Sequence, residues 1–389
     1  MPDRGALPAG HGTPPWSRRH FLGLSSIWLS GCAVRQVRVR PLFAPTAFAP
    51  VDVRPERLIR TIVGLRPFRP SGFVVRAEKL DTKVVIHNYG HGGAGITLSW
   101  GTAQLAIQEG LKTGVRDCAV IGCGVVGLST ACLLQQHGFT VTIYAKALPP
   151  DTTSNIAGGL WDPVTVYDHP QVSAEFRKQF GEAGRFAFRR YQSLVGQTYG
   201  VRWLPLFNLS TDSARQPPSP ESPNSEIEPL YPDAKQLTRD ENPFDVPYAY
   251  RRYSMLIEPA IYLSALMRDF VTAGGRIVVR EFAGASELLA LREELLFNCT
   301  GLGARTLFGD NELVPVRGQL CFLLPQPEVN FMTVGPGDIY MFPRQDGILL
   351  GGSHERGNWS LEPDSATTER ILSENGKLFA GMSLRPHGI

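Results

Sequence analysis

The stretch CAVIGCGVVGLSTACLLQQHGFTVTIYA, residues 118–145, constrains the fold more than any other part of the chain. It has the pattern of a short buried strand, a glycine-rich turn, an apolar helix that ends at Gly138, and a second strand. The turn holds Gly122, Gly124 and Gly127 in the spacing GxGxxG, which lets the backbone approach a pyrophosphate at a helix N-terminus. This order of elements predicts a βαβ unit that binds a dinucleotide, either FAD or NAD(P).

The rest of the chain predicts a two-part α/β protein. Residues 259–275 have the apolar spacing of a helix, with proline in the first turn and Gly-Gly at the end. Residues 212–233 hold six prolines and few apolar residues, which predicts a surface loop. Two further strands are expected over 276–282 and 294–301. The strands expected over 318–324, 338–344 and 347–352 indicate a mixed or antiparallel sheet.

The composition is that of a folded globular protein. The 389 residues are 43% hydrophobic and 19% charged, with a net charge of +3. No basic stripe with interleaved aromatic residues is present, so the sequence predicts no nucleic-acid partner. The six cysteines show neither a CxxC pair nor a His/Cys metal spacing, which predicts no disulfide framework and no metal site.

The first 32 residues resemble an export signal. Arg18 and Arg19 precede Phe-Leu and a short apolar stretch, which is the pattern of a twin-arginine signal. The apolar stretch is too short to span a bilayer and suits a signal peptide. Leu-Ser-Gly-Cys at 29–32 resembles a lipobox that would leave Cys32 lipidated. We therefore expect export in the folded state, a lipid anchor at the periplasmic face of a membrane, and a linker over 33–54.

A glycine-rich segment lies upstream of the dinucleotide motif, and it identifies a family resemblance. VIHNYGHGGAGITLSWGTA, residues 85–103, resembles the signature of D-amino-acid oxidases. The resemblance implies a Rossmann-like FAD-binding domain with a mixed or antiparallel substrate sheet. It also implies FAD-dependent conversion of D-amino acids and oxygen to 2-oxo acids, ammonia and hydrogen peroxide. Other segments that resemble the family are GLRPFRP (64–70), DTTSNIAGGLWDP (151–163), FNCTG (297–301), RGQ (317–319), YMFPRQDGILLGG (340–352) and GNWS (357–360).

The resemblance implies roles for four residues toward the substrate. Arg66 and Tyr340 would hold the substrate carboxylate, for which a guanidinium fork is well suited. Gly93 would lie against the substrate. Asp162 stands at a position that lines the family's pocket, where it would favour cationic D-amino acids; the alternative is a carboxylate at a strand end.

Further residues would contact FAD. Lys146 stands where an acidic residue usually ends the second strand, so it is either a solvated strand-end residue or a partner for the 2′-phosphate of NADP. The signature would supply backbone contacts to the flavin, and the hydroxyls of 152–154 would bind phosphate. The expected cofactor contacts are Gly92, Gly93, Gly95, Ile96, Thr97, Gly122, Gly124, Val125, Val126, Gly127, Lys146, Thr152, Thr153, Ser154, Gly158, Gly159 and Leu160.

The segments occur in an unusual order. In typical family members the Arg-Pro segment and the glycine-rich signature lie near the C-terminus, whereas here both precede the dinucleotide motif. This order indicates a circular permutation, in which 55–114 completes the substrate and FAD sites, 115–165 forms the FAD-binding βαβ unit, and 166–389 forms the substrate domain with a return near 294–305. Two alternatives stay open: a flavin-dependent dehydrogenase or glycine-oxidase-like enzyme with another acceptor, and a non-catalytic binding protein.

Overall fold

The computed structural model describes residues 48–382. Contacts divide the chain into two units, 1–46 and 47–389, and every described residue belongs to the second. The predicted export signal and Cys32 lie outside the described residues. Within 48–382 no helix is both long enough and apolar enough to cross a membrane.

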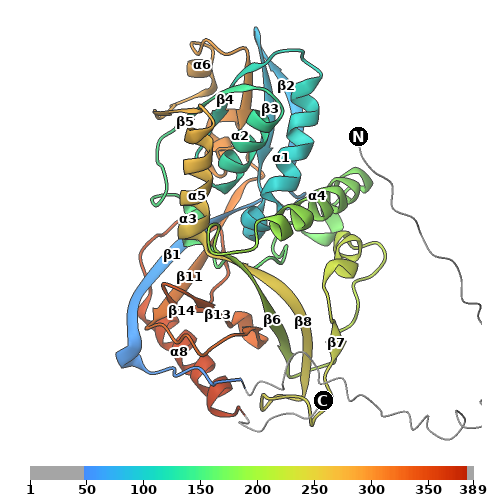
Figure 1. Cartoon of the computed structure of the whole chain (residues 1–389), viewed down its shortest axis with the longest axis vertical. Helices are drawn as coiled ribbons and strands as arrows, with labels where there is room; N and C mark the ends of the chain where they lie inside the picture. The colour runs from blue at the N-terminus through green and yellow to red at the C-terminus, as the bar shows by residue number, and fades with distance from the viewer. Residues whose placement is uncertain (1–47, 383–389) are drawn as a thin grey trace, which may run out of the picture. The chain divides into compact units, whose positions relative to one another are not determined.

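A six-stranded sheet carries the predicted dinucleotide motif (Figure 1). Five of its six strands run parallel to one another, and the edge strand Val74–Leu80 is antiparallel to its neighbour. The strands are β-branched and apolar, as expected of a parallel sheet covered on both faces. In spatial order they are β2 (Val74–Leu80), β3 (Lys83–Tyr89), β10 (Leu295–Asn298), β4 (Asp117–Ile121), β5 (Thr140–Ala145) and β9 (Arg276–Val279).

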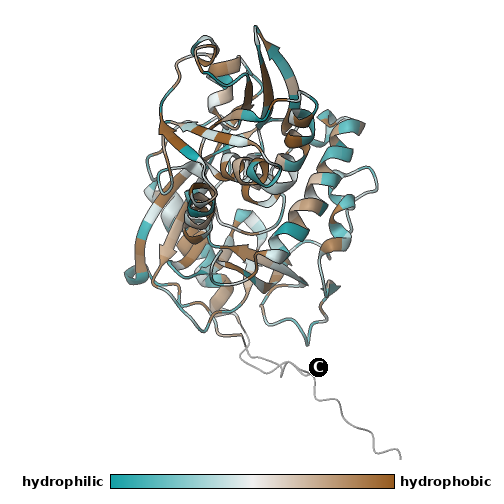
Figure 2. Cartoon of the chain, turned by 45° about the horizontal axis from the view of Figure 1, so that its top comes forward, coloured by the Kyte–Doolittle hydropathy of each residue, from teal (hydrophilic) through white to brown (hydrophobic). Residues whose placement is uncertain are grey.

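Helices cover this sheet with their apolar residues. On one face α1 (Gly95–Leu111) packs against α2 (Val125–Gln136) and α4 (Ala174–Ser193), and α2 also packs against α5 (Pro259–Thr272). These helices and the strands share one large apolar cluster that includes Trp100 and Phe180. A smaller cluster around Leu288 of α6 (Ala285–Leu288) covers other strand residues. Figure 2 shows hydrophobic colour along strands and covering helices, with hydrophilic colour on outer turns.

The second sheet of the fold has nine strands. On one face the sheet and α8 (Ser365–Ala380) share an apolar cluster that includes Phe207, Phe331 and Phe379. Helix α8 begins where the Asp364 side chain accepts a hydrogen bond from the Thr367 N–H. On the other face Leu206, Leu256 and Phe342 form an apolar cluster with Leu320 and with the partly buried Ile156. The strands are β1 (Leu58–Phe68), β11 (Val314–Leu323), β14 (Gly347–Gly351), β13 (Tyr340–Arg344), β12 (Met332–Val334), β6 (Val201–Ser210), β8 (Tyr248–Ile257) and β7 (Lys235–Gln236), with β15 (Glu355–Arg356) on β11.

The predicted α/β class, the βαβ opening and the mixed second sheet are confirmed. The helix expected over 259–275 ends at Thr272, and the strand expected over 276–282 ends at Val279. The proline-rich segment 212–233 is a loop with two short 3-10 turns. All five cysteines in residues 48–382 are buried and free.

The first and last described segments lie together. The backbone N–H of Asp52 donates to Oε1 of Gln326 at 2.8 Å. Val51 and Phe48 belong to the same apolar cluster as Phe379 and Met382 at the end of α8. The chain therefore starts its described fold beside the place where that fold ends.

Candidate active site

A cavity of about 540 Å³ opens at the carboxyl ends of the parallel strands. Strand β4 ends there at Ile121, β5 at Ala145, β10 at Asn298 and β3 at Tyr89. Open α/β sheets bind their ligands at this edge, at the point where the connections that follow two neighbouring strands run in opposite directions along the sheet. The cavity has the size of a small-molecule or cofactor site.

The glycine-rich turn lies against backbone at two of its positions. A β-carbon at Gly122, whose φ is +113°, would lie 2.5 Å from the carbonyl oxygen of Cys299. A β-carbon at Gly127 would lie 2.1 Å from the Gly122 carbonyl oxygen. The first and third glycines therefore permit the close packing of strand, turn and helix that the motif requires.

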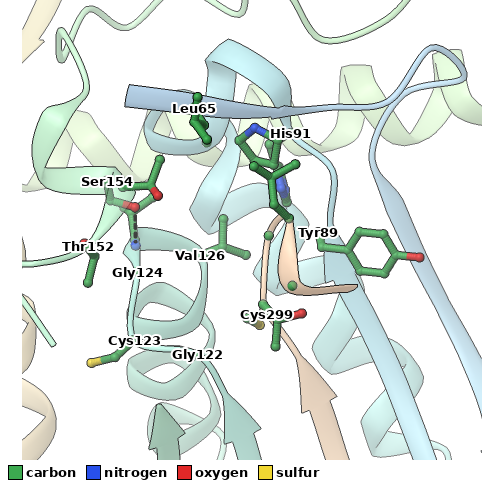
Figure 3. A pocket seen from close by; sticks show the side chains of 18 of the residues that line it. Leu65, Tyr89, His91, Gly122, Cys123, Gly124, Val126, Thr152, Ser154 and Cys299 are labelled. Carbon is green, nitrogen blue, oxygen red and sulfur yellow. Dashed lines mark hydrogen bonds between the residues drawn. The ribbon is translucent and has the colours of Figure 1, made fainter. Parts of the chain in front are cut away.

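The N-terminus of α2 faces the cavity with the second glycine as its cap residue. Gly124 has no side chain, so the cap leaves the helix end open toward a ligand. The Val125 N–H donates to the Ser154 hydroxyl at 2.9 Å, and Ser154 comes from α3 (Thr153–Ile156) (Figure 3). Backbone N–H groups and the positive end of the helix dipole make this a place for phosphate.

The upstream signature supplies another wall of the same cavity. His91 and the three glycines Gly92, Gly93 and Gly95 line it. The His91 Nε2 lies 2.9 Å from the Thr102 hydroxyl, and full burial lowers the pKa of His91 to about 3. Figure 3 shows Tyr89 directed away from the Gly122–Gly124 turn, and its hydroxyl donates to Asp310 at 2.9 Å. His91 is therefore a neutral, structurally held residue of the wall.

Arg66 and Tyr340 lie at the cavity and close to each other. Both residues line it, although they come from β1 and β13. Burial raises the pKa of the Tyr340 hydroxyl, while the charge of the Arg66 guanidinium and its hydrogen bond oppose this rise. Nη1 of Arg66 also donates to the Ser353 carbonyl at 3.2 Å. A cation and a hydroxyl donor thus face one space, as a carboxylate ligand requires.

Glycines in neighbouring strands make room for these two side chains. Gly64 pairs with Gly318 across β1 and β11, and a β-carbon at Gly318 would lie 2.4 Å from Nη1 of Arg66. Tyr340 pairs with Gly351, where a β-carbon would lie 2.0 Å from its ring. The glycines of the RGQ and Leu-Gly-Gly segments therefore have a steric role beside the site.

The structure brings most of the predicted site residues to this cavity. The predicted residues that line it are Arg66, Gly92, Gly93, Gly95, Ile96, Gly122, Gly124, Val125, Val126, Lys146, Thr152, Thr153, Ser154, Gly158 and Tyr340. Five others lie outside the lining: Thr97, Gly127, Gly159, Leu160 and Asp162. Thr97 donates to the Leu160 carbonyl at 3.3 Å, so both support the wall from behind.

Asp162 is engaged elsewhere. Its carboxylate accepts from Arg252 at 2.7 Å and from the Tyr231 hydroxyl at 2.7 Å. The side chains of Arg252 and Asp162 are only 5% and 14% exposed, and the Arg252 guanidinium lies 3.7 Å from the centre of the Tyr231 ring. The Asp162 carboxylate therefore holds Arg252 and Tyr231 in the packed interior, and the structure does not place it where it would select cationic substrates.

Lys146 lies at the far end of the cavity with an acidic partner. Its Nζ is 3.3 Å from Oε1 of Glu281, and both residues line the cavity. Glu281 and the adjacent Arg280 follow β9, the strand next to β5. The sequence singled out neither residue, because both fall inside the strand expected over 276–282, whereas β9 ends at Val279.

Arg344 is a further residue that the sequence did not single out. It is buried on β13 and donates to the Ala157 carbonyl at 3.0 Å. Asp346 accepts from its other nitrogens at 2.8 and 2.9 Å. Arg344 thus ties the segment after α3 to the strand that carries Tyr340.

Comparison with known proteins agrees with this geometry. The family described as FAD dependent oxidoreductase, DAO, matches residues 117–387. The chain belongs to this family of FAD-dependent oxidoreductases. A D-amino-acid oxidase of Rubrobacter xylanophilus is 30% identical, with 66% of this chain and 76% of the relative covered. Human D-aspartate oxidase is also 30% identical, with 66% and 73% covered.

Solved structures show the same fold at lower identity. The glycine oxidase of Geobacillus kaustophilus has a TM-score of 0.50 at 16% identity, covering 68% of this chain and 78% of that protein. The iminodiacetate oxidase of Chelativorans sp. BNC1 has a TM-score of 0.50 at 13% identity, covering 68% and 79%. The family match begins at residue 117, so Arg66 and the signature at 85–103 lie upstream of it.

The described residues fit FAD as the cofactor. The cavity runs from Lys146 and Glu281 past the glycine turn to Arg66 and Tyr340. It therefore offers a strand-end region for adenosine, the α2 N-terminus for the pyrophosphate, and the space beside Arg66 for the flavin and substrate. The residues that would hold the cofactor are Gly122, Gly124, Val125, Ser154 and the glycines of the signature.

Proposed function

We propose that the protein oxidises D-amino acids at the α-carbon, giving an imino acid that water converts to a 2-oxo acid and ammonia. The observation that carries this proposal is the convergence of Arg66 and Tyr340 on one end of the FAD cavity. We further propose oxygen as the electron acceptor, with hydrogen peroxide as its product.

The two residues provide binding and orientation. The Arg66 fork donates two hydrogen bonds to a carboxylate, and the Tyr340 hydroxyl donates a third. Holding the carboxylate at two points fixes the position of the α-carbon. Such orientation of the reacting atom lowers the activation barrier of the oxidation. FAD, when bound, supplies the two-electron acceptor for the substrate. Gly318 and Gly351 leave room for both side chains, so their geometry is fixed by the sheet.

The relatives support the D-configuration. The sequences at 30% identity are named D-amino-acid oxidase and D-aspartate oxidase, and another at 28%, from Dictyostelium discoideum, is a D-amino-acid oxidase. Two of these names refer to D-amino acids in general and one to D-aspartate, so they support the class of substrate and not one amino acid.

The test is anaerobic mixing of the purified, FAD-loaded full chain with matched amino acids. D-alanine, D-aspartate and D-lysine are each compared with their L-isomers and with glycine, and the visible absorbance of the flavin is followed. We expect bleaching by D-isomers and none by L-isomers. Readmitting oxygen should then restore the absorbance and release hydrogen peroxide.

Other outcomes separate the alternatives. Bleaching by L-isomers or by glycine alone would contradict the proposed substrate class. Bleaching by D-isomers with slow recovery in oxygen would favour a dehydrogenase. The Arg66→Met variant is the matched control, because it should keep its FAD and lose reduction at low substrate concentration while partly recovering it at high concentration.

We also propose that the chain is exported by the twin-arginine route and anchored through Cys32. Support comes from the adjacent arginines, the short apolar stretch and the Leu-Ser-Gly-Cys segment. Expression in a bacterial host with Arg18→Lys and Arg19→Lys together should retain the protein in the cytoplasm. Cys32→Ala should release it from the membrane fraction; unchanged fractionation of both variants would contradict the proposal.

We also propose that the chain is a circular permutant of the typical family arrangement. Support comes from the family match that starts at residue 117 and from the cavity residues supplied upstream of it. The hydrogen bond from Asp52 to Gln326 and the shared packing of Val51 and Phe379 bring the described ends together. A re-permuted gene that begins near Arg116 and joins residue 382 to residue 48 should give a folded flavoprotein.

A further inference from the structure

Strands β5 and β9 end side by side at one edge of the six-stranded sheet. The two strands are parallel neighbours, with Ala145 opposite Val279, and the Arg280 N–H donates to the Ala145 carbonyl at 2.9 Å. The residues that follow, Lys146 on one strand and Glu281 on the other, therefore leave the sheet side by side. This is the carboxyl edge, where such sheets hold the ribose of a bound dinucleotide.

Fold stability does not explain the Lys146–Glu281 pair. Nζ and Oε1 are 3.3 Å apart, and the side chains are 74% and 72% exposed. A pair this open to water contributes little to folding. Both residues nevertheless line the cavity, so their placement matters for what enters it.

Hydrogen-bond chemistry distinguishes the two residues. A ribose offers two hydroxyl donors, and a dinucleotide fold usually meets them with a carboxylate at the end of the second strand. Lys146 occupies that position and has no acceptor. Glu281 has four lone-pair positions and reaches the same place from the adjacent strand.

One other carboxylate lines the cavity within residues 48–382, and its position suits it less. Asp151 stands three residues before Ser154, whose hydroxyl accepts from the Val125 N–H at the start of α2, where the pyrophosphate is expected. A carboxylate beside a pyrophosphate is repelled by it. Glu281 lies instead beyond the ends of β5 and β9, away from that charge.

We infer that Glu281 binds the hydroxyls of the adenosine ribose of FAD, in place of the acidic residue that Lys146 has replaced. Lys146 holds the Glu281 carboxylate in position through their ion pair. The Lys146 ammonium is thereby neutralised, so the site has no free cation dedicated to a 2′-phosphate. The NADP alternative raised by Lys146 loses its basis under this assignment.

The test measures FAD binding and not turnover. Full-length protein is prepared as holoenzyme, and FAD release on dilution is followed by the rise in flavin fluorescence. The same measurement uses FAD analogues that lack the 2′- or the 3′-hydroxyl of adenosine. Variants are Glu281→Gln, with Glu294→Gln as the matched control, because Glu294 is an exposed glutamate outside the cavity lining.

Wild type and Glu294→Gln should bind FAD about tenfold more tightly than at least one deoxy analogue. Glu281→Gln should bind FAD about tenfold more weakly and should no longer distinguish the analogue. The double variant Lys146→Asp with Glu281→Lys returns the carboxylate to the second strand and should recover the discrimination. Circular dichroism checks that each variant is folded.

Two results would overturn the assignment. One is a Glu281→Gln protein that binds FAD as wild type does and still distinguishes the analogues. The other is loss of discrimination in Asp151→Asn while Glu281→Gln retains it, which would move ribose recognition to Asp151. Neither depends on which amino acid the enzyme oxidises, so failure here and failure of the proposed function are distinguishable.

Discussion

The guanidinium of Arg66 occupies the space that a side chain at Gly318 would fill: a β-carbon there would lie 2.4 Å from Nη1. The two residues come from antiparallel neighbours, β1 and β11, whose register places Arg66 opposite Val316 and Gly64 opposite Gly318. Because Gly318 on β11 has no side chain, the guanidinium of Arg66 on β1 can lie at this position.

Gly318→Ala should displace the end of the Arg66 side chain without unfolding the sheet, because the flexible guanidinium moves more easily than backbone. We expect KM for D-amino acids to rise about tenfold or more, since carboxylate binding requires a fixed fork. Steady-state kinetics and FAD content are the measurements. Gly376→Ala in α8, where the nearest atom would be 3.8 Å from the new β-carbon, is the control and should leave KM unchanged.

Asp162→Asn should destabilise the fold and leave substrate preference alone. Removing the carboxylate at 2.7 Å leaves the buried Arg252 with only Glu228, at 3.8 Å, and costs about 3 kcal/mol in the free energy of unfolding. Asp233→Asn breaks the exposed pair with the neighbouring Arg251 and should cost less than about 1 kcal/mol. Denaturant unfolding measures both. A selective loss of D-lysine turnover in Asp162→Asn at unchanged stability would contradict this assignment.

His91 should make stability fall as the pH falls. Its pKa is about 3 in the folded protein against 6.5 in the unfolded chain, so the unfolded chain binds more protons between these values. Above pH 6.5 His91 is neutral in both states and does not lower the free energy of unfolding. At pH 5 its protonation in the unfolded chain lowers that free energy by about 2 kcal/mol. Burial also lowers the pKa of His87, which acts in the same direction.

Thermal unfolding at about pH 7 and about pH 5 tests this in His91→Asn, whose amide can still bond Thr102. We expect a smaller difference between the two pH values in the variant than in wild type. His137→Asn, at the exposed end of α2, should keep the wild-type difference. An equal pH dependence in all three proteins would show that His91 is protonated without penalty.

Ser154→Ala should weaken FAD binding about fivefold, because the hydroxyl holds the Val125 N–H at the helix end that faces the phosphate. Ser193→Ala removes a comparable hydroxyl, bonded to the Arg190 carbonyl at the end of α4, and serves as the control. Flavin fluorescence on dilution measures both. Wild-type affinity in Ser154→Ala would remove this hydroxyl from the cofactor site.

The sequence predicted those parts of the fold that depend on local pattern. The βαβ opening follows from strand, glycine turn and apolar helix in direct succession, and all three lie where expected. Arg66, Gly93 and Tyr340 were predicted from segments resembling one family, and the structure brings them to one cavity. Their roles toward substrate stay predictions.

Other features depend on contacts that no local pattern contains. Asp162 pairs with Arg252 because β8 lies beside the segment that follows α3. The two residues are 90 positions apart in the sequence, so no local pattern predicts their contact. Glu281 reaches the cavity because β9 pairs with β5, and strand pairing is a property of the whole sheet. The role of Gly318 beside Arg66 likewise requires the register of β1 on β11.

Two early strands, β1 and β3, pair with strands that are made much later. Leu58 pairs with Leu323 and Val84 with Leu295, so until most of the chain has been synthesised β1 has no strand partner and β3 has only its hairpin neighbour β2. Pairing between such distant segments slows folding, because the loop must close before any contact rewards it. Arg66 and the glycines of residues 92–95 therefore leave the ribosome early, and the cavity that they line can assemble only once translation is nearly complete.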